Sequence, residues 1–365
     1  MTPVSIQFLV ASSLAMGTGA GSGPTTADPL APLPKGAVRT SPTFQPPPPI
    51  VGTQAYAPAG LRQRIDALGR NFDGKAGVSV VSLKSGWQAE YNAASLFPQQ
   101  SCSKLWVAIT AMDAADKGSI RLDDRVTLGR SDLTLFHQPL AAKILGGGHT
   151  TTLGALMFTA ITESDNTAND KLMRSIGGPQ AVRDMIAAKG LGSIRFYEGE
   201  RALQSKIAGL IWSPSYSIGD AFYKARGALP LAIRRSSFER YIADPYDGAA
   251  PHAVATALAR LKRGELLSDS STQRLLSTMG STKTGKLRVR AALAPGWSWN
   301  HKTGTGQNFQ GRVGGINDIG ILTASDGTGY AVAIMTVPNK TDGASQDLMQ
   351  AVARAIIASH NERPH

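Results

Sequence analysis

The feature that most constrains the fold is where strand-like segments occur from residue 60 onward. Short apolar or alternating segments bounded by turn residues predict strands at 77–83 and 88–92. Three more predicted strands follow much later, at 297–303, 315–323 and 330–337. We therefore expect a single sheet that combines strands from both ends of this region.

The residues between these two groups of strands have a different pattern. From about 101 to 290 the apolar residues recur at helical spacing and are interrupted by glycines. Helices are also predicted at 61–72 and 346–359. We expect an α+β fold in which the helical middle forms a lobe against the sheet, with a functional site in the cleft where the two meet.

The N-terminal part has a composition unlike the rest. Residues 5–16 are apolar, too short to span a bilayer as a stable helix but consistent with the core of a secretory signal. The basic residues that usually precede such a core are missing, since the first lysine is Lys35. We expect a signal segment at 1–23, an extended proline-rich linker at 24–58 and one domain at 59–362, in a protein exported to the periplasm or secreted.

Charge and cysteine content exclude several classes of function. The chain has 38 Lys+Arg against 26 Asp+Glu, a net charge of +12, which could attract nucleic acid or anionic envelope polymers. Aromatic residues make up only 6% of the chain and are not interleaved with basic runs, so we expect no nucleic-acid partner. Cys102 is the single cysteine and the six histidines are scattered, so we expect no disulfide, no metal and no cofactor.

Ser101 is the only serine with a lysine three residues further on, Lys104, and an apolar helical run follows at once. In the first turn of a helix such residues share a face, with Cβ atoms about 5–6 Å apart. A lysine whose pKa is lowered could take the serine proton, and the helix N-terminus would favour the developing oxyanion. The alternative is a surface serine beside a solvated lysine.

A second polar cluster, Ser164, Asp165 and Asn166, interrupts an otherwise apolar helical run. A second hydroxyl could relay a proton, and the asparagine amide could hold a substrate carbonyl. The alternative is a helix cap, in which Ser164 or Asp165 accepts hydrogen bonds from free backbone N–H groups.

The third cluster is Lys302, Thr303, Gly304 and Thr305, at the end of a strand-like alternation. Lys302 and Thr303 could receive a substrate carboxylate, the glycine lets a ligand lie close to the backbone, and the Thr305 N–H could complete an oxyanion hole. A second Lys-Thr-Gly at 283–285 has no strand alternation before it, so we do not assign it as the site.

Together, Ser-x-x-Lys, Ser-Asp-Asn and Lys-Thr-Gly in this order resemble the motifs of penicilloyl serine transferases, the β-lactamases and penicillin-binding D,D-peptidases. Over about residues 60–360 the chain resembles a class A β-lactamase in particular. Further segments similar to that family are residues 97–98, 164–168, 176–179, 260–267 and 290–297. The resemblance implies a five-stranded antiparallel sheet with a helical lobe, and a serine hydrolase that opens β-lactams without a cofactor.

The resemblance also implies roles for the acylating residues. Ser101 would be the nucleophile, its proton passing to Lys104 or, through water, to Glu200. Ser164 would pass a proton to the leaving nitrogen, with Lys302 nearby.

Other residues of the site would bind the substrate. Backbone N–H groups of Ser101 and Thr305 would form the oxyanion hole, and Asn166 would hold the acylamide side chain. Thr303 and Arg288 would hold the substrate carboxylate, although Arg288 lies among other basic residues and could equally belong to a solvated face. Phe136 or His137 could supply an aromatic ring at the mouth of the cleft.

The residues that would clear the acyl-enzyme follow from the same resemblance. An ungapped alignment from Ser164 puts Glu200 where the family has the glutamate that activates water. Gln204 falls where an asparagine usually helps to hold that water, and glutamine reaches one methylene further.

The chain departs from the family in two places. Glu198 stands where class A proteins usually have an arginine that pairs with an aspartate, which corresponds to Asp247 here. Residues 205–246 replace a short loop of the family and have helical patterning, so they would form either a lid over the cleft or a surface addition.

These departures leave other functions open. A D,D-carboxypeptidase or related hydrolase acting on peptidoglycan peptides or esters would share every acylating residue. A penicillin-binding sensor would acylate and stay acylated, and a basic polymer-binding protein would keep the site only as a relic. We expect a monomer with a small β-lactam substrate.

Overall fold

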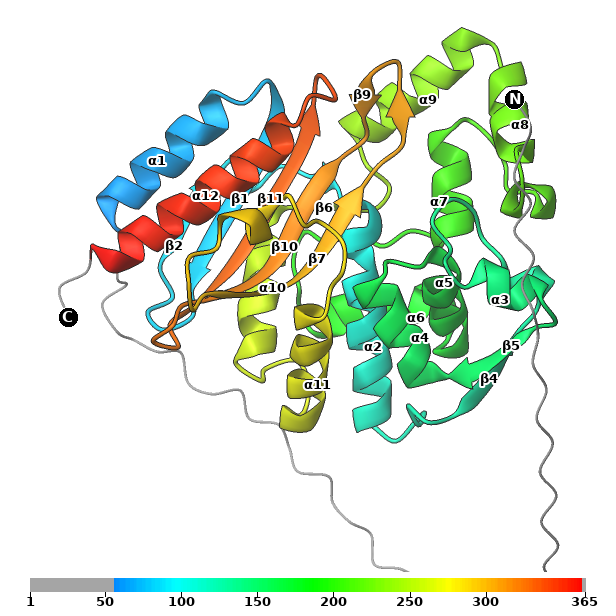
Figure 1. Ribbon diagram of the computed structural model, residues 1–365, viewed down its shortest axis with the longest axis horizontal. Coiled ribbons are helices and arrows are strands. Elements are labelled where there is room, and N and C mark those ends of the chain that lie inside the picture. Colours follow the sequence, from blue (N-terminus) through cyan, green and yellow to red (C-terminus); the bar gives the residue numbers. More distant parts are fainter. Residues whose placement is uncertain (1–55, 363–365) are drawn as a thin grey trace, which may run out of the picture. The chain divides into compact units, whose positions relative to one another are not determined.

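The computed structural model describes residues 56–362. The predicted signal segment at 1–23 and nearly all of the predicted linker at 24–58 lie outside the described residues. Within this range the main elements follow the predicted order of a helix, two strands, a long mainly helical stretch, three strands and a last helix (Figure 1).

Five strands form one antiparallel sheet in the order β2-β1-β11-β10-β7. Their bounds are β1 (Gly74–Ser82), β2 (Gln88–Tyr91), β7 (Ser298–Thr305), β10 (Ile316–Thr323) and β11 (Gly329–Pro338). The early strand β1 pairs with the last strand, with Gly74 opposite Pro338. The predicted sheet built from both ends of the domain is therefore confirmed, and β7, which carries Lys302, is one of its edges.

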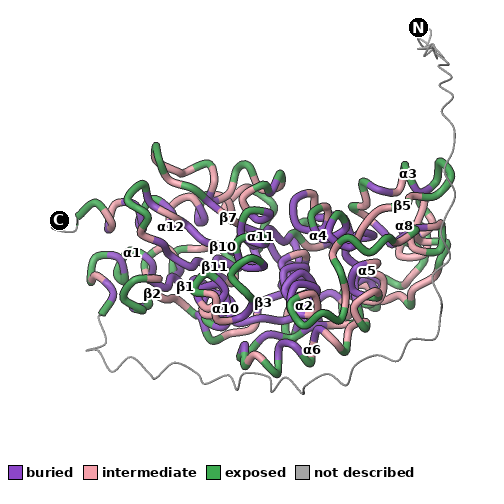
Figure 2. Tube along the Cα trace, turned by 90° about the horizontal axis from the view of Figure 1, so that it is seen from below, coloured by how far each residue is buried: buried purple, intermediate pink, exposed green. Residues whose placement is uncertain are grey.

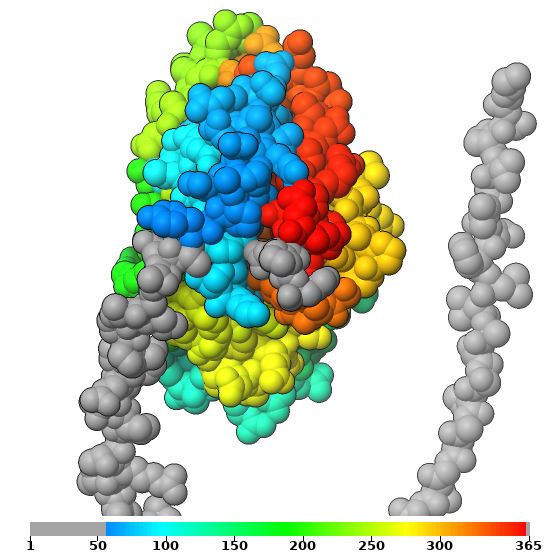
Figure 3. All heavy atoms as spheres, turned by 90° about the vertical axis from the view of Figure 1, so that its left-hand side faces the viewer, coloured from blue at the N-terminus to red at the C-terminus, as the bar shows by residue number. Residues whose placement is uncertain are grey.

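Two helices cover one face of the sheet. Helix α1 (Ala59–Arg70) lies beside α12 (Ala344–Asn361), and Figure 3 faces this pair. The two helices share one apolar cluster with the sheet, to which α1 contributes Leu61 and Ile65 and α12 contributes Val352. The first and last parts of the domain thus fold as one unit.

The central strand β11 is buried on both faces. Val332 and Ile334 belong to the cluster under α1 and α12, whereas Ala333 and Met335 belong to the larger cluster on the opposite face. Since successive side chains of a strand point to opposite faces, a strand covered on both sides has a continuous apolar sequence. This accounts for the unbroken apolar run of the last predicted strand.

The opposite face is covered by α10 (Pro251–Lys262), and α2 (Lys104–Asp116) lies between the sheet and the helical lobe. All residues of α2 from Lys104 to Asp113 are buried, as its purple tube in Figure 2 shows. A helix that is apolar on every side has to be surrounded by protein. Any polar side chain of α2 is therefore desolvated, which matters for Lys104.

The lobe consists of helices around α2. They are α3 (Ala141–Leu145), α4 (Leu153–Thr162), α5 (Asn166–Ser175), α6 (Gly178–Ala188) and α11 (Asp269–Gly280). The prediction of a helical middle is wrong at two points: β4 (Arg125–Leu128) pairs with β5 (His149–Thr152), and the short strand β6 (Gly248–Ala249) also lies in this stretch. The sequence of β5 is His-Thr-Thr-Thr, whose β-branched residues favour a strand but show no apolar alternation.

Residues 205–246 are helical in the structure. The segment begins within α7 (Glu200–Ile207) and continues through the 3₁₀ turn η3 (Pro214–Ser217), α8 (Ala221–Ala228) and α9 (Leu231–Ala243). Phe222 of α8 packs against Phe136, with ring centroids 4.9 Å apart. Phe238 of α9 packs against Phe309, at 5.5 Å. Buried aromatic residues thus anchor the segment to the rest of the domain at two points.

Two short strand pairs complete the domain: β3 (Phe97–Pro98) with β6 (Gly248–Ala249), and β8 (Asn308–Phe309) with β9 (Arg312–Val313). Among residues 56–362, no helix combines the length and apolar character needed to cross a membrane.

Candidate active site

Ser101 lies in the 3₁₀ turn η1 (Gln100–Ser103), directly before α2. The preceding residue, Gln100, has a φ of 53°, a left-handed conformation that is unusual for a residue with a side chain. Its backbone N–H donates to the carboxylate of Asp247 at 2.7 Å. Strained backbone of this kind persists only where the surroundings fix it, and it is concentrated at functional sites.

The ammonium group of Lys104 is at the centre of the site. Its Nζ donates to Ser101 Oγ at 2.8 Å and to Asn166 Oδ1 at 2.8 Å. It also donates to Glu200 Oε1. The side chains of Lys104 and Glu200 are 0% and 4% exposed, so this is a buried ion pair.

These three acceptors match the three N–H donors of a charged lysine. The arrangement therefore describes Lys104 as an ammonium and Glu200 as a carboxylate. In this state Lys104 cannot accept the proton of Ser101. Transfer of a proton to Glu200, with which Lys104 is directly hydrogen-bonded, would free Lys104 to do so.

Glu200 is held by its neighbours on both sides. Its backbone N–H donates to Asp170 Oδ1 at 3.0 Å, and its Oε2 accepts a hydrogen bond from Gln204 Nε2 at 3.1 Å. Gln204 Nε2 also donates to Gln100 Oε1 at 3.1 Å. Burial and the neighbouring Glu200 raise the pKa of Asp170.

Ser164 and Lys302 form the second half of the constellation. Lys302 Nζ donates to Ser164 Oγ at 2.8 Å and to the Thr303 carbonyl at 2.9 Å. Ser164 has a φ of 63°, a second strained residue at the site. Burial, together with the charge of Lys104, lowers the pKa of Lys302 from 10.5 to about 7.

The helix-cap interpretation of 164–166 is correct for Asp165. Its carboxylate accepts from Ala168 N at 2.7 Å as the N-cap of α5, and from Leu140 N at 2.7 Å. Asn166 begins α5 and donates to the Leu135 carbonyl at 2.9 Å, in addition to its contact with Lys104. The cap thus fixes the residues on either side of it, and the roles predicted for Ser164 and Asn166 stay predictions.

The edge strand β7 lies close against the serine turn, and Gly304 makes this possible. A Cβ atom at Gly304 would lie 2.3 Å from the Gln99 carbonyl oxygen, which no side chain could tolerate. The next residue, Thr305, continues the strand and pairs with Ile316. The glycine therefore brings the backbone of β7 up to Ser101.

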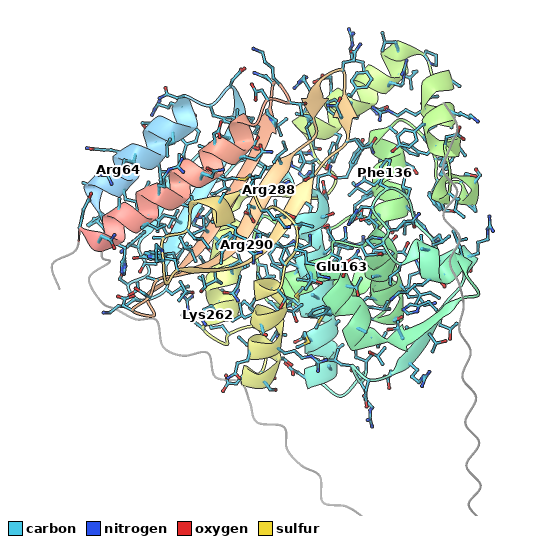
Figure 4. The ribbon with its side chains drawn as sticks, in the orientation of Figure 1. Arg64, Phe136, Glu163, Lys262, Arg288 and Arg290 are labelled. Atoms are coloured by element: carbon cyan, nitrogen blue, oxygen red, sulfur yellow. The ribbon has the colours of Figure 1, made fainter. Side chains whose placement is uncertain are left out.

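Arg288 lies beside the same strand. Its guanidinium donates to the carbonyls of Gly304 at 3.0 Å and Asn317 at 2.6 Å, and to Thr305 Oγ1 at 2.6 Å. Figure 4 shows Arg288 beside the sheet and Phe136 beside the lobe helices. Of the two interpretations of Arg288, these contacts favour a residue of the site.

Two residues near the site had no assigned role in the sequence. Thr284, from the Lys-Thr-Gly that we set aside, contacts Thr303 through their hydroxyls at 2.6 Å. Its neighbour Lys283 is exposed and pairs with Glu163 at 2.6 Å. Asp170 follows the Ser-Asp-Asn motif by four residues, on the same face of α5 as Asn166, and helical periodicity could have indicated it.

Asp247 and Glu198 do not pair with each other. The arginine–aspartate pair that the class A resemblance implied for these two positions is absent here. Glu198 is half exposed and pairs with Arg183 at 3.0 Å. Asp247 is buried and accepts from Tyr241 Oη at 2.9 Å, besides the Gln100 N–H. Burial raises the pKa of Asp247 to about 7, against the effect of these hydrogen bonds. Tyr241, from α9, thus donates to Asp247, for which the class A resemblance implied an arginine partner.

A cavity of about 350 Å³ opens above Ser101. Its walls include Asn166, Gln204 and Thr305, and both aromatic candidates, Phe136 and His137. The volume lies in the range of small-molecule sites. Another cavity, of about 360 Å³ around Leu191 and Thr256, contains none of the predicted site residues, so we locate the site by its chemistry.

The sequence-predicted site residues therefore lie together, and four of them, Ser101, Asn166, Gln204 and Thr305, line this cavity. Ser101, Lys104, Asn166, Glu200 and Gln204 form one hydrogen-bonded group on the lobe side. The remaining members, on and beside β7 or in contact with it, are Ser164, Arg288, Lys302, Thr303, Gly304 and Thr305.

Residues 56–362 contain no group of three or more His, Cys, Asp or Glu placed to hold a metal ion. Cys102 is buried beside the serine, and burial raises the pKa of its thiol to about 12. The thiol is therefore protonated at neutral pH and is a poor nucleophile.

Fold and site together define an active-site-serine hydrolase with a lysine and a glutamate beside the serine. The model of the β-lactamase enzyme family matches residues 60–359. The chain belongs to the β-lactamase enzyme family.

Among curated proteins, the chain is 26% identical to β-lactamase CTX-M-97 of Escherichia coli over 81% of this chain and 88% of the relative. It is 26% identical to the carbapenem-hydrolyzing β-lactamase KPC of Klebsiella oxytoca over 85% and 92%. Among solved structures, a β-lactamase from Chitinophaga pinensis superimposes with a TM-score of 0.67 at 24% identity, covering 82% and 99% of the two chains.

Proposed function

We propose that this protein is a serine β-lactamase, which hydrolyses the β-lactam amide through an acyl-enzyme on Ser101. Membership of the family supports the reaction class. The observation that carries the proposal is the position of Lys104 Nζ, which contacts both Ser101 Oγ and the Glu200 carboxylate. One nucleophile with one connected proton acceptor suits both formation and hydrolysis of an acyl-enzyme.

In acylation, Ser101 Oγ attacks the lactam carbonyl and its proton leaves by one of two routes. Lys104 can first give a proton to Glu200 and then accept the serine proton, or Glu200 can accept it through a water molecule. Collapse of the tetrahedral intermediate breaks the C–N bond. The leaving nitrogen takes a proton from Ser164, which is resupplied from Lys302 or Lys104.

Substrate is oriented by the sheet side of the cavity. The N–H groups of Ser101 and Thr305 bind the oxyanion, a contribution of about 3–4 kcal/mol per donor in other enzymes. Thr303 and Arg288 hold the substrate carboxylate. Asn166 has a second amide N–H beyond the one given to Leu135, and this N–H binds the acylamide carbonyl.

After acylation, Glu200 returns its proton through Lys104 to the lysine that supplied the leaving nitrogen, and so becomes a carboxylate again. In deacylation, Glu200 then removes a proton from a water that attacks the ester carbonyl. Gln204, which contacts Glu200, positions that water. The ester C–O bond breaks and the proton returns to Ser101, which completes the cycle without a cofactor.

Turnover of a chromogenic cephalosporin by the full chain, followed beside the intact mass of the protein, tests the proposal. We expect many turnovers with no lasting adduct. Glu200→Ala should slow turnover by about 10²–10⁴-fold, the usual range for a general base, and should accumulate one acyl group on Ser101. Ser101→Ala serves as the control that forms no adduct.

A different outcome would change the function. If the unmodified protein consumes one equivalent and keeps a stable adduct on Ser101, the proposal fails in favour of a D,D-peptidase or a penicillin-binding sensor. Undiminished turnover without an adduct in Glu200→Ala would instead remove Glu200 from deacylation.

We also propose the finer organisation of the protein: removal of residues 1–23 during export, a linker at 24–58, and a monomeric enzyme in the periplasm or medium. Its substrates, β-lactams and possible peptidoglycan-derived peptides, are found in those compartments. The intact mass of the chain recovered from the exported fraction tests export and the removal of residues 1–23. The mass of the same protein in solution tests its oligomeric state.

A further inference from the structure

Helix α8, from the segment 205–246, contributes to the wall of the catalytic cavity. Tyr223 and Arg226 of this helix line the same cavity of about 350 Å³ as Ser101. Figure 1 shows α8 and α9 in light green beyond α7. The segment was expected to form either a lid over the cleft or a surface addition. Because α8 lines the cavity, the segment forms part of the cavity wall.

Arg226 is a half-buried cation without an anionic partner. Its guanidinium donates to the Asn308 carbonyl at 2.8 Å and, at a longer 3.4 Å, to Gln307 Oε1. Both acceptors are neutral, and within residues 56–362 Arg226 takes part in no ion pair. Burial, with the nearby charge of Arg234, lowers its pKa, and an arginine keeps its charge nevertheless.

The other side chains that line the cavity do not balance this charge. Apart from His137, the remaining residues of the wall are neutral, and none is a carboxylate. Glu200 lies nearby but is already paired with Lys104. Arg226 also lies over the Phe309 ring, 5.8 Å from its centroid. A guanidinium has five N–H donors, and the two hydrogen bonds of Arg226 leave donors for a ligand.

Aromatic rings lie on the same side of the cavity. The ring centroids of Phe136 and Tyr223 are 6.2 Å apart, and Phe222 beneath them is packed edge-on against both. Tyr223 is 58% exposed, so its ring is available at the mouth. The wall thus offers an apolar surface next to a free positive charge.

Arg226 is separate from the cation assigned to the common carboxylate of the substrate. Arg288 contacts Thr305 from the sheet side, whereas Arg226 reaches the cavity from α8 and contacts Asn308. A ligand in this cavity would therefore meet the charge of Arg226 at a position separate from that of Arg288. The second position lies on the side of Phe136 and Gln204, where the acyl side chain would extend.

We propose that Arg226, with Phe136 and Tyr223, forms a subsite for an acyl side chain of the substrate that carries both an aryl group and a carboxylate. This inference rests on the proposed function and names a substrate class for it. A carboxylate pairs with guanidinium through charge-assisted hydrogen bonds, and the aryl ring packs on the two aromatic side chains.

The test compares two penicillins that differ only in a carboxylate on the benzylic carbon, carbenicillin and benzylpenicillin. We expect Arg226→Gln to lower kcat/KM for carbenicillin by about 10–100-fold, the effect of losing one charge-assisted contact, and to change benzylpenicillin by less than about twofold. Arg235→Gln is the matched control, because Arg235 lies in the same segment, exposed, with only Gln310 as partner at 3.3 Å.

The outcomes separate the subsite from the proposed function. An equal loss for both penicillins, or no loss, overturns the subsite while leaving β-lactam hydrolysis intact. If the unmodified protein turns over neither compound, the proposed function fails. The subsite is then decided by calorimetry on Ser101→Ala with and without Arg226→Gln, where a Kd for carbenicillin that does not rise with the second substitution overturns it.

Discussion

The two buried lysines of the site have opposite electrostatic environments. Lys104, in α2, pairs with the carboxylate of Glu200. Among the residues that the structure describes, Lys302, in β7, donates only to the hydroxyl of Ser164 and the carbonyl of Thr303. Burial lowers the pKa of Lys302 to about 7. The comparison teaches that burial alone does not determine whether a lysine stays charged; the presence of a buried anion does.

This difference between the environments of Lys104 and Lys302 agrees with the catalytic roles proposed for the two sides of the cavity. The lobe side keeps a charged pair that can move one proton between Lys104 and Glu200 and so serve Ser101. The sheet side holds Lys302 near the point where it gains or loses its proton at neutral pH. A substrate carboxylate bound nearby would favour the charged form of Lys302, so substrate binding would itself provide the positive charge on the sheet side of the cavity.

The largest expected effect is the difference in unfolding free energy between the same substitution made at Lys104 and at Lys302. Lys104→Met leaves Glu200 buried without its cation, which typically costs about 3–5 kcal/mol of unfolding free energy. Lys302→Met removes a buried charge that has no anion, so we expect unchanged stability or a gain of about 1–2 kcal/mol. Both variants should lose most activity. Urea unfolding at pH 6.5 measures the difference.

The pH dependence of Lys302→Met provides the control. In the folded protein Lys302 has a pKa of about 7, against 10.5 for an ordinary lysine, so between these values the unfolded chain binds more protons and stability rises with pH. The cost of Lys302 is therefore complete below pH 7 and is relieved toward 10.5. The advantage of Lys302→Met should shrink across this window. Equal destabilisation by both substitutions would refute the comparison.

Much of this site could be predicted because its motifs are local. Ser101 and Lys104 are three residues apart, and the cleft follows from a sheet built from both chain ends with a helical lobe between them. The ion pair that distinguishes Lys104 from Lys302 was not predicted; alignment indicated Glu200, which is far from Lys104 in sequence, but not its contact with Lys104. Glu200 itself carries no local signal beyond a charged residue.

What the sequence could not reveal depends on contacts between distant segments. Tyr241 looks like any aromatic residue of an amphipathic helix, yet its hydroxyl meets Asp247. Thr284 belongs to a motif that lacked strand alternation, and it reaches Thr303 because its turn folds back onto β7. Arg226 has no motif at all. In each case the contact depends on how distant segments pack together. The hydrophobic periods of 2 residues for strands and 3.6 for helices predict the elements but not these contacts.

A middle-sized effect is expected at Tyr241, which reaches the lobe-side pair through other side chains. Its hydroxyl accepts from Gln100 Nε2 at 2.6 Å, and Gln100 Oε1 in turn accepts from Gln204, which contacts Glu200. Tyr241→Phe should cost about 1–3 kcal/mol, because buried partners lose their hydrogen bond. We expect deacylation to slow about tenfold, measured as acyl-enzyme accumulating in the steady state.

Tyr246→Phe is the matched control for loss of a tyrosine hydroxyl. The ring of Tyr246 lies 5.9 Å from that of Tyr241 and is only partly buried. We expect its stability to change by less than about 0.5 kcal/mol. If Tyr241→Phe lowers stability but leaves the ratio of acylation to deacylation unchanged, the tyrosine holds the fold and not the position of Glu200.

The smallest effect is expected at Glu198, and it sharpens the contrast between buried and exposed ion pairs. Glu198 pairs with Arg183 at 3.0 Å, but the two side chains are 51% and 35% exposed, so water screens the interaction. Exposed pairs contribute about 0–1 kcal/mol. Glu198→Ala should therefore change the unfolding free energy by less than about 0.5 kcal/mol and turnover by less than twofold. An accumulating acyl-enzyme in this variant would show that the surface pair, and not the Tyr241–Asp247 contact, holds the loop that carries Glu200.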